Sequence, residues 1–353
     1  MSDEKSKNTP PEYVTMKIDP EIFAELGVRD PEQIKLETKI MKETRRLKKE
    51  LKKDTDNLEK QIDLATLYVD GGNYEDAITM LKTIISRDNK NFKAYKVLGT
   101  AYVLFDHEDE AIREMNRAAE LNPDDAEIHF NLGGVYMLQD MFENAAMEFK
   151  KVIQLDPTDQ TAYANLTMAY EMQGMYLEEI RVLKKVLMFE PENKELRSAL
   201  STAYYNNMQF EEALAAALVV VENDEKDPQA HCNLGSVYSA MNMVTEAIES
   251  FKKASELDPE FSLPHTNLGS LYGSLGSTES AIKEFKKATT LNPGDEGAWL
   301  NLFNSYKDVG LHDQAAEAYQ KFEELTREKP AQEASNVSNI PGGAVHRSDK
   351  SPS

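Results

Sequence analysis

The feature that most constrains this chain is a sequence period of 34 residues. Three near-identical segments, which begin at Asn131, Asn233 and Asn267 and read Asn-Leu-Gly followed by a short stretch to tyrosine, lie at multiples of that period. Eight contiguous copies can be drawn without inserted residues, and they start at Leu58, Phe92, Ala126, Gln160, Lys194, Pro228, Ser262 and Glu296. Self-similarity at this length predicts a solenoid, in which each copy packs mainly on its neighbours.

Positions within the repeat predict two helices per copy. Position 7 is leucine and position 11 is tyrosine in all eight copies, and with position 4 they fall on one face of a helix. Position 8 is small in seven copies and position 20 is alanine in seven, so we expect two antiparallel helices that approach closely. Proline at position 32 in five copies ends the second helix. The predicted fold is all-α, with stacked helix pairs.

The length and the pattern of a small residue, tyrosine, alanine and proline resemble tetratricopeptide repeats over 272 of the 353 residues. The resemblance implies a right-handed superhelical solenoid whose first helices line a concave groove that captures peptides or proteins. It also implies that repeat positions 2, 5, 6, 9, 12 and 13 face this groove. The predicted repeats are 58–91, 92–125, 126–159, 160–193, 194–227, 228–261, 262–295 and 296–329.

Asparagine recurs at position 6, and we interpret it as part of a peptide-binding groove. The five copies are Asn131, Asn165, Asn233, Asn267 and Asn301. Asparagine is a mediocre helix former, and its carboxamide can pair with a peptide backbone of any sequence. This ladder is similar to the one in the repeat arm of O-linked N-acetylglucosamine transferases. The alternative is that these carboxamides only satisfy neighbouring backbone.

Other candidate groove residues are Lys96, Phe130, Met137 and Met168, the last three forming with Met172 a predicted apolar patch in the third and fourth repeats. A related family variant clamps the acidic tails of chaperones with lysine and arginine. Thr100 stands where such a clamp needs asparagine, and Thr161 and Asn165 stand where it needs cations, so the sequence argues against a chaperone tail as partner.

Charge and composition narrow the class of partner. The net charge of −22 lies entirely in residues 58–329, because residues 1–57 and 330–353 are each neutral, and such a surface repels phosphate backbones. We therefore expect no nucleic-acid partner. The longest apolar run, 213–221, is too short to span a membrane. A single cysteine, Cys232, and no signal-peptide pattern predict a cytoplasmic protein.

The repeat pattern breaks most in the fourth and fifth copies. Glu179 replaces the alanine of position 20, Arg197 replaces the aromatic residue of position 4, and Glu225 replaces the proline. A carboxylate at a close helix contact is costly without a partner, although Arg181 and Lys184 lie on the same predicted helix. We expect a loosened junction within 167–225. The alternative is that Glu179 reaches solvent with little consequence.

The flanks differ from the repeats. We expect residues 1–18 and 330–353 to be disordered, and residues 19–57 to form a helical extension with one short helix and a second from about 31 to 53. The second helix has a basic end. It could cap the first repeat, which is our first choice; it could pair as a coiled coil; or its cations could bind an acidic partner, a membrane surface or the acidic repeats themselves.

No catalytic constellation emerges from the sequence. His129, His231 and His265 occupy position 4, a packing position, and no histidine pair has metal-ligand spacing. No phosphate loop or dinucleotide fingerprint occurs, so no cofactor or metal is expected, and only 24 residues follow the repeats. The chain is predicted to be a scaffold that binds peptide or protein segments and not an enzyme. The alternative is a structural protein that oligomerises through the solenoid ends and displays partners on its outer surface.

Overall fold

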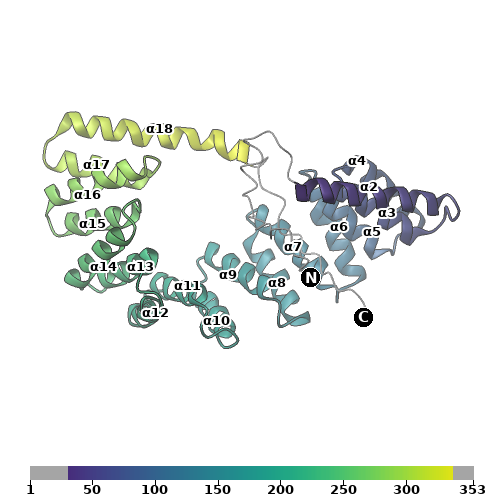
Figure 1. The fold of residues 1–353 in the computed structure, drawn as a ribbon, viewed down its shortest axis with the longest axis horizontal. Coiled ribbons are helices and arrows are strands. Elements are labelled where there is room, and N and C mark those ends of the chain that lie inside the picture. The colour runs from purple at the N-terminus through teal and green to yellow at the C-terminus, as the bar shows by residue number, and fades with distance from the viewer. Residues whose placement is uncertain (1–30, 337–353) are drawn as a thin grey trace, which may run out of the picture. The chain divides into compact units, whose positions relative to one another are not determined.

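The computed structural model describes residues 31–336, which form seventeen helices and no strand. The chain divides into two units at Pro123 (Figure 1). The helices of the first unit are α2 (Pro31–Leu51), α3 (Leu58–Asp70), α4 (Tyr74–Arg87), α5 (Phe92–Val103) and α6 (Glu108–Leu121). Those of the second are α7 (Ala126–Leu138), α8 (Phe142–Leu155), α9 (Gln160–Met172), α10 (Tyr176–Leu187), α11 (Lys194–Asn206), α12 (Phe210–Asn223), α13 (Pro228–Ala240), α14 (Val244–Leu257), α15 (Leu263–Ser274), α16 (Thr278–Leu291), α17 (Glu296–Asp308) and α18 (His312–Asn336).

The helix pairs coincide with the predicted repeats, which confirms the all-α fold of stacked pairs. Seven of the eight first helices begin at the first residue of a repeat, because the last residue of the preceding period caps them. That residue is Asn57, Asn91, Asp125, Asp159, Asn193, Asp227 or Asp295, and its side chain accepts a hydrogen bond from a backbone N–H of the first turn. Phe261 stands at this place before the seventh repeat, and α15 begins one residue later, at Leu263.

Every repeat turns between its two helices through a residue with positive φ at position 15. The eight residues are Gly72, Asp106, Asp140, Gly174, Met208, Asn242, Gly276 and Gly310, with φ between 54° and 75°. Glycine, aspartate and asparagine tolerate this left-handed conformation, whereas methionine adopts it at a cost. Met208, in the fifth repeat, is therefore the strained member of the series.

The close approach of the paired helices has a specific geometry. The glycine at position 8 faces a large side chain at position 24: a Cβ placed on Gly133, Gly235 or Gly269 would lie within 2.7 Å of Phe149, Phe251 or Phe285. The small residue therefore makes room for a ring on the partner helix and does not simply meet the alanine of position 20. In the eighth repeat both positions are aromatic: Phe303 stands at position 8 and Tyr319 at position 24, and their ring centroids lie 5.0 Å apart.

In the first unit, α2 covers the first repeat, as in the first of the three alternatives for this helix. Leu47 of α2 is buried, and Glu50 pairs with Lys60 of α3 at 3.1 Å. The ammonium of Lys48 lies 5.1 Å from the ring centre of Tyr68. At least one cation of the basic end, Lys48, therefore contacts the first repeat of its own unit. The short helix predicted between 19 and 27 lies outside the described residues.

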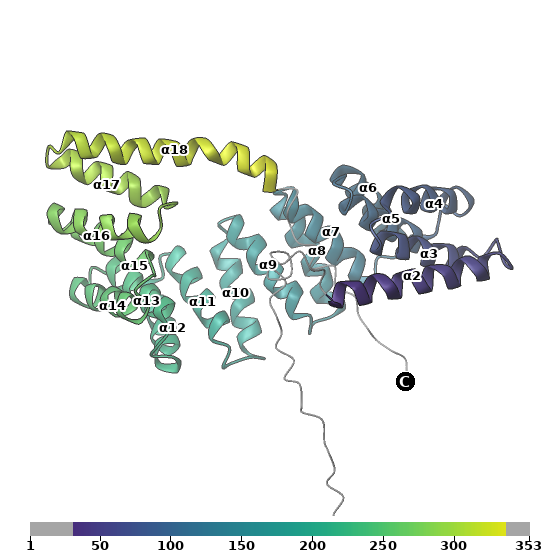
Figure 2. The ribbon, with the colours of Figure 1, turned by 45° about the horizontal axis from the view of Figure 1, so that its top comes forward.

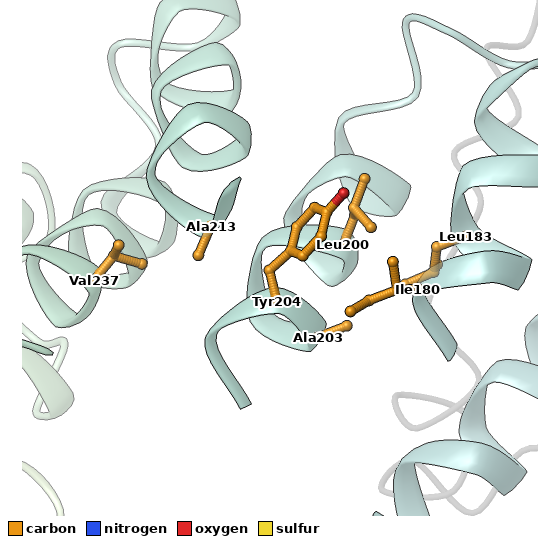
Figure 3. Close-up of a cluster of buried hydrophobic side chains, with 7 residues drawn as sticks. All are labelled: Ile180, Leu183, Leu200, Ala203, Tyr204, Ala213 and Val237. Carbon is orange, nitrogen blue, oxygen red and sulfur yellow. The ribbon is translucent and has the colours of Figure 1, made fainter. Parts of the chain in front are cut away.

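In the second unit, successive helices from α7 to α18 pack in chain order, and Figure 2 shows the stacking of α13 to α18 from a second side. One apolar cluster runs from Ile180 and Leu183 of α10 through Leu200, Ala203 and Tyr204 of α11 to Ala213 of α12 and Val237 of α13 (Figure 3). The last helix, α18, continues to Asn336, so residues 330–336 are helical and the prediction of disorder from residue 330 is wrong for them. Residues 337–353 lie outside the described part. Within the described residues no helix is long and apolar enough to cross a membrane.

The junction predicted to be loosened, 167–225, contains the whole of α10, α11 and α12, the end of α9, and most of the apolar cluster of Figure 3. Its flexibility stays a prediction. Because Glu179 and Met208 each add a cost to this region, we expect amides of α10 and α11 to exchange hydrogen at least tenfold faster than those of α13 and α14. Hydrogen exchange followed by mass spectrometry measures this. Equal protection in the two helix pairs would show that the junction is as firmly packed as its neighbours.

Candidate functional site

The first helices of the second unit present a row of exposed or half-exposed neutral side chains. We call this row the first-helix face; its members are Asn165, Met168, Met172, Thr202, Ser236, Ser270, Asn301 and Asn304. They stand at repeat positions 6, 9 and 13 and come from five helices, α9, α11, α13, α15 and α17. Met168 and Met172 are the most exposed apolar members, at 53% and 57%.

The five asparagines of position 6 do not act alike. The carboxamides of Asn233 and Asn267 reach back to the preceding first helix: Asn233 Nδ2 donates to Ser198 Oγ at 3.3 Å, and Asn267 Nδ2 donates to Ser236 Oγ at 3.4 Å. Asn233 also accepts a hydrogen bond from Gln229. These two carboxamides therefore link neighbouring repeats by bonding to serine side chains. The alternative drawn from the sequence had expected them to bond to neighbouring backbone groups.

The other three asparagines are differently placed. Asn131 is buried, with its Nδ2 unpaired. Asn165 and Asn301 are half-buried, and their carboxamides form no hydrogen bond within the described residues. Two of the predicted ladder residues, Asn165 and Asn301, thus combine solvent access with unused hydrogen-bonding groups.

The remaining candidate residues are divided between the two units. Lys96 lies on α5 of the first unit and is half-buried. In the second unit, Met137 is half-buried, whereas Phe130 is 7% exposed and packs edge-on against Phe149 at 5.8 Å. Phe130 is therefore a core residue and does not belong to an exposed apolar patch, because the helix pair closes over its ring. Met168 and Met172 are the exposed part of that predicted patch.

Beside the first-helix face lies a cavity of about 430 Å³, which we call the Glu179 pocket. Its most buried lining residues, which we call its floor, are Glu179, 3% exposed, and Val220, 4% exposed. Its other lining residues are Thr167, Glu171, Lys194, Glu195, Ser198, Ala199, Thr202, Asp227 and Gln229, of which Glu171, Glu195, Thr202 and Gln229 are exposed. The pocket thus has a buried floor and a rim that reaches solvent.

Glu179 has no ionic partner within the described chain. Its Oε2 is buried without a hydrogen bond. The cations that the sequence placed nearby are used elsewhere: Arg181 pairs with Glu178 at 3.3 Å, and Lys184 stacks over Tyr204. The side chain is buried and does not reach solvent, so the second sequence alternative is wrong. Loss of water by burial, and secondly repulsion from Glu171, raise the pKa of Glu179 to about 7.

The sequence contains a signal for this pocket, the glutamate at position 20 of the fourth repeat. By itself this residue predicts a loosened helix contact and not a binding pocket. Alanine occupies position 20 in seven repeats, and the methyl group fits between the helices. In the fourth repeat a carboxyl group occupies that place, and Thr167 and Ser201 stand at position 8 of the fourth and fifth repeats where glycine is usual. A residue that departs from the repeat consensus where two helices contact each other can therefore indicate a pocket.

The histidines of position 4 are held by structural contacts. His129 Nδ1 lies 2.6 Å from Glu148 Oε2, and His265 Nδ1 lies 2.7 Å from Glu284 Oε2. Burial would raise the pKa of Glu148, but its hydrogen bonds with His129 and Lys151 hold that pKa below its usual value. His231 contacts the carbonyl of Glu225 at 2.9 Å. His129 and His265 are buried and His231 is half-buried, so these histidines have structural roles at a packing position and are held there by hydrogen bonds.

Cys232 is not placed for nucleophilic chemistry. Its side chain is 1% exposed, and burial raises the pKa of the thiol to about 12, against the weak opposite effect of the hydrogen bond from Asn267. Among the described residues, no three histidine, cysteine, aspartate or glutamate side chains converge to hold a metal ion.

Comparisons with known proteins agree with this architecture. Models of the tetratricopeptide repeat, also described as TPR repeat, match residues 37–97, 109–140, 126–159, 228–261 and 264–295. No curated protein matches the chain. Among solved structures, the chain is similar to the C-terminal part of a TPR repeat-containing protein from Cytophaga hutchinsonii, with 16% identity, 68% of this chain and 99% of that chain covered, and a TM-score of 0.52.

Two further solved structures are similar over about half of this chain. One is YrrB, described as a TPR protein with an unusual peptide-binding site, with 27% identity, 52% of this chain and 95% of that chain covered, and a TM-score of 0.40. The other is MamA, with 25% identity, 47% and 97% covered, and a TM-score of 0.40. Family matches fall on both units, and the matches to 126–159 and 228–261 have the bounds of two predicted 34-residue repeats. The chain therefore belongs to the tetratricopeptide-repeat family.

Proposed function

We propose that this protein is a non-catalytic scaffold that binds extended peptide segments on the first-helix face of its second unit. The observation that carries the proposal is half-buried Asn165, whose carboxamide has no hydrogen bond in the described structure, beside exposed Met168 and Met172 on the same helix. A carboxamide pairs with one N–H and one C=O of a peptide backbone, and methionine adapts to varied apolar side chains.

The spacing of the face suits an extended segment. Packed helices lie roughly 10 Å apart, and an extended chain advances about 3.3 Å per residue, so each repeat would meet about every third ligand residue. Apart from Asn165 and Asn301 at position 6, the face offers hydroxyl and amide groups at position 9 on Thr202, Ser270 and Asn304. A cytoplasmic location stays a prediction from the single cysteine.

Selection of random twelve-residue peptides displayed on phage, with the full chain immobilised, tests the proposal. We expect enriched peptides that bind the wild-type chain and bind the double variant Asn165→Ala/Met168→Ser about tenfold or more weakly, because both substitutions remove ligand contacts without opening the core. The matched control is Met147→Ser, since Met147 is an exposed methionine, 46% accessible, on the second helix α8.

The outcomes separate the two candidate functions. Enriched peptides that bind all three proteins equally would contradict a binding site on the first-helix face. Absence of any enriched peptide would contradict peptide binding as the function. The alternative, self-assembly through the solenoid ends, predicts a sedimentation coefficient that rises with protein concentration between about 1 and 100 µM, whereas a monomeric scaffold predicts a constant one.

A further inference from the structure

We propose that the Glu179 pocket receives a cationic side chain, lysine or arginine, from the peptide segment bound on the first-helix face. The inference rests on the proposed function and specifies which residue type that function selects. Thr167 and Glu171 of the pocket share α9 with Asn165 and Met168 of the face, and Thr202 belongs to both surfaces. A segment lying along the face therefore passes the rim of the pocket.

The first argument is the unpaired carboxyl at the floor. Glu179 is 3% exposed, and its Oε2 has no hydrogen-bond partner. Burying a carboxyl group without a partner is costly, and native structures satisfy nearly all such groups. Because Glu179 lines the pocket, a hydrogen-bond donor supplied by a ligand there could satisfy this oxygen.

The second argument is the sign of the charge. Four carboxyl groups, those of Glu171, Glu179, Glu195 and Asp227, line the pocket, and Lys194 is its one cationic lining residue. Lys194 is bound to Asp224 at 3.1 Å, and that contact raises the pKa of its ammonium group. Asp227 is occupied as the N-cap of α13. The remaining field is negative, which favours a cation and rejects an acidic side chain.

The third argument is shape. Half-buried Ala199 and Thr167 also line the pocket, beside the buried floor residues Glu179 and Val220. Lysine and arginine have apolar stems and charged ends, so the stem would lie along these residues while the charge reaches Glu179. A charge-assisted hydrogen bond between the two groups, shielded from water, is stronger than one between neutral groups. A divalent ion fits less well, because no three metal-binding side chains converge among the described residues.

A double-mutant cycle tests the proposal with peptides obtained by the phage selection described above. The best-binding peptide with a lysine or arginine is synthesised together with a version in which norleucine replaces that residue, and both are titrated calorimetrically into wild-type and Glu179→Gln protein. Glu179→Gln removes the charge at nearly constant volume, so the fold is retained, and circular dichroism checks this. Met147→Ser is again the control for an exposed position.

We expect the norleucine peptide to bind wild type about tenfold or more weakly than the cationic peptide, and the Glu179→Gln protein to bind both with similar affinity. At pH 6.5, binding of the cationic peptide should also release a proton from wild type and none from Glu179→Gln, because the cation holds the carboxyl ionised. Titration in two buffers with different ionisation enthalpies measures that proton, which a purely structural role of Glu179 would not release.

Two other results have different meanings. If the selected peptides carry no enriched lysine or arginine, or if the coupling in the cycle is below about twofold, the pocket proposal is overturned while peptide binding stands. If no peptide is selected at all, the proposed function fails, and the pocket proposal fails with it.

Discussion

Replacing Glu179 with alanine is expected to raise the free energy of unfolding by about 2 to 3 kcal/mol at pH 8, and by less than about 1 kcal/mol at pH 5. Alanine is the residue at this position in the other seven repeats, where it is 0 to 5% exposed. The substitution removes a buried carboxyl group without a partner and introduces a side chain that fits the same helix contact.

The pH dependence follows from the pKa. The pKa of the carboxyl is near its ordinary value of 4.5 in the unfolded chain and about 7 in the folded one. The folded state therefore holds the proton over this interval, and each rise in pH across it lowers the stability of wild type. Above about pH 7 the cost is constant. The gain in unfolding free energy from Glu179→Ala should thus grow from pH 5 to about pH 7 and then level off.

Thermal and urea unfolding of both proteins between pH 5 and 8.5 measures this difference. Glu179→Gln is the matched control: it removes the charge and keeps a buried polar group, so its effect should vary little above pH 7 and stay smaller than that of alanine. A difference between wild type and Glu179→Ala that is the same at every pH would show that Glu179 does not ionise at the cost of stability.

The second large effect concerns two adjacent glycines on α7. Gly133→Ala is expected to lower the free energy of unfolding by about 2 kcal/mol or more, because the new Cβ would lie 2.7 Å from Phe149, whose ring is fully buried. Gly134→Ala is expected to raise it by about 0.5 to 1 kcal/mol, because nothing lies within 4 Å of that Cβ and alanine favours the helix. Urea unfolding of the two single variants compares positions on the same helix.

A compensating change distinguishes the contact from other causes. Ala65 and Leu81 occupy the same two repeat positions in the first repeat, where both are fully buried. The double variant Gly133→Ala/Phe149→Leu reproduces this combination. It should therefore be more stable than the single variant Gly133→Ala, which retains the Phe149 ring. If the decrease in unfolding free energy of the double variant equals the sum of the decreases of the two single variants, the proposed contact between positions 8 and 24 is contradicted.

The sequence by itself determined the architecture. Helix pairs, their boundaries and their stacking follow from leucine at position 7, tyrosine at position 11 and the capping residue at position 34, because these signals are local and recur in nearly every copy. It also indicated where the pattern fails, at Glu179 and Arg197. Repetition makes such failures visible, since each copy is a reference for the others.

Only the tertiary structure decided which side chains are available for binding. Asn233 and Asn267 are bound by the preceding repeat, whereas Asn165 is not, although all three have the same position in the period. Phe130 is covered by the helix that carries Phe149, and Glu179 is left without a cation because Arg181 and Lys184 turn to other partners. The sequence period fixes which face a residue occupies, but exposure and pairing depend on the side chains that neighbouring helices place opposite it, and these differ from one repeat to the next.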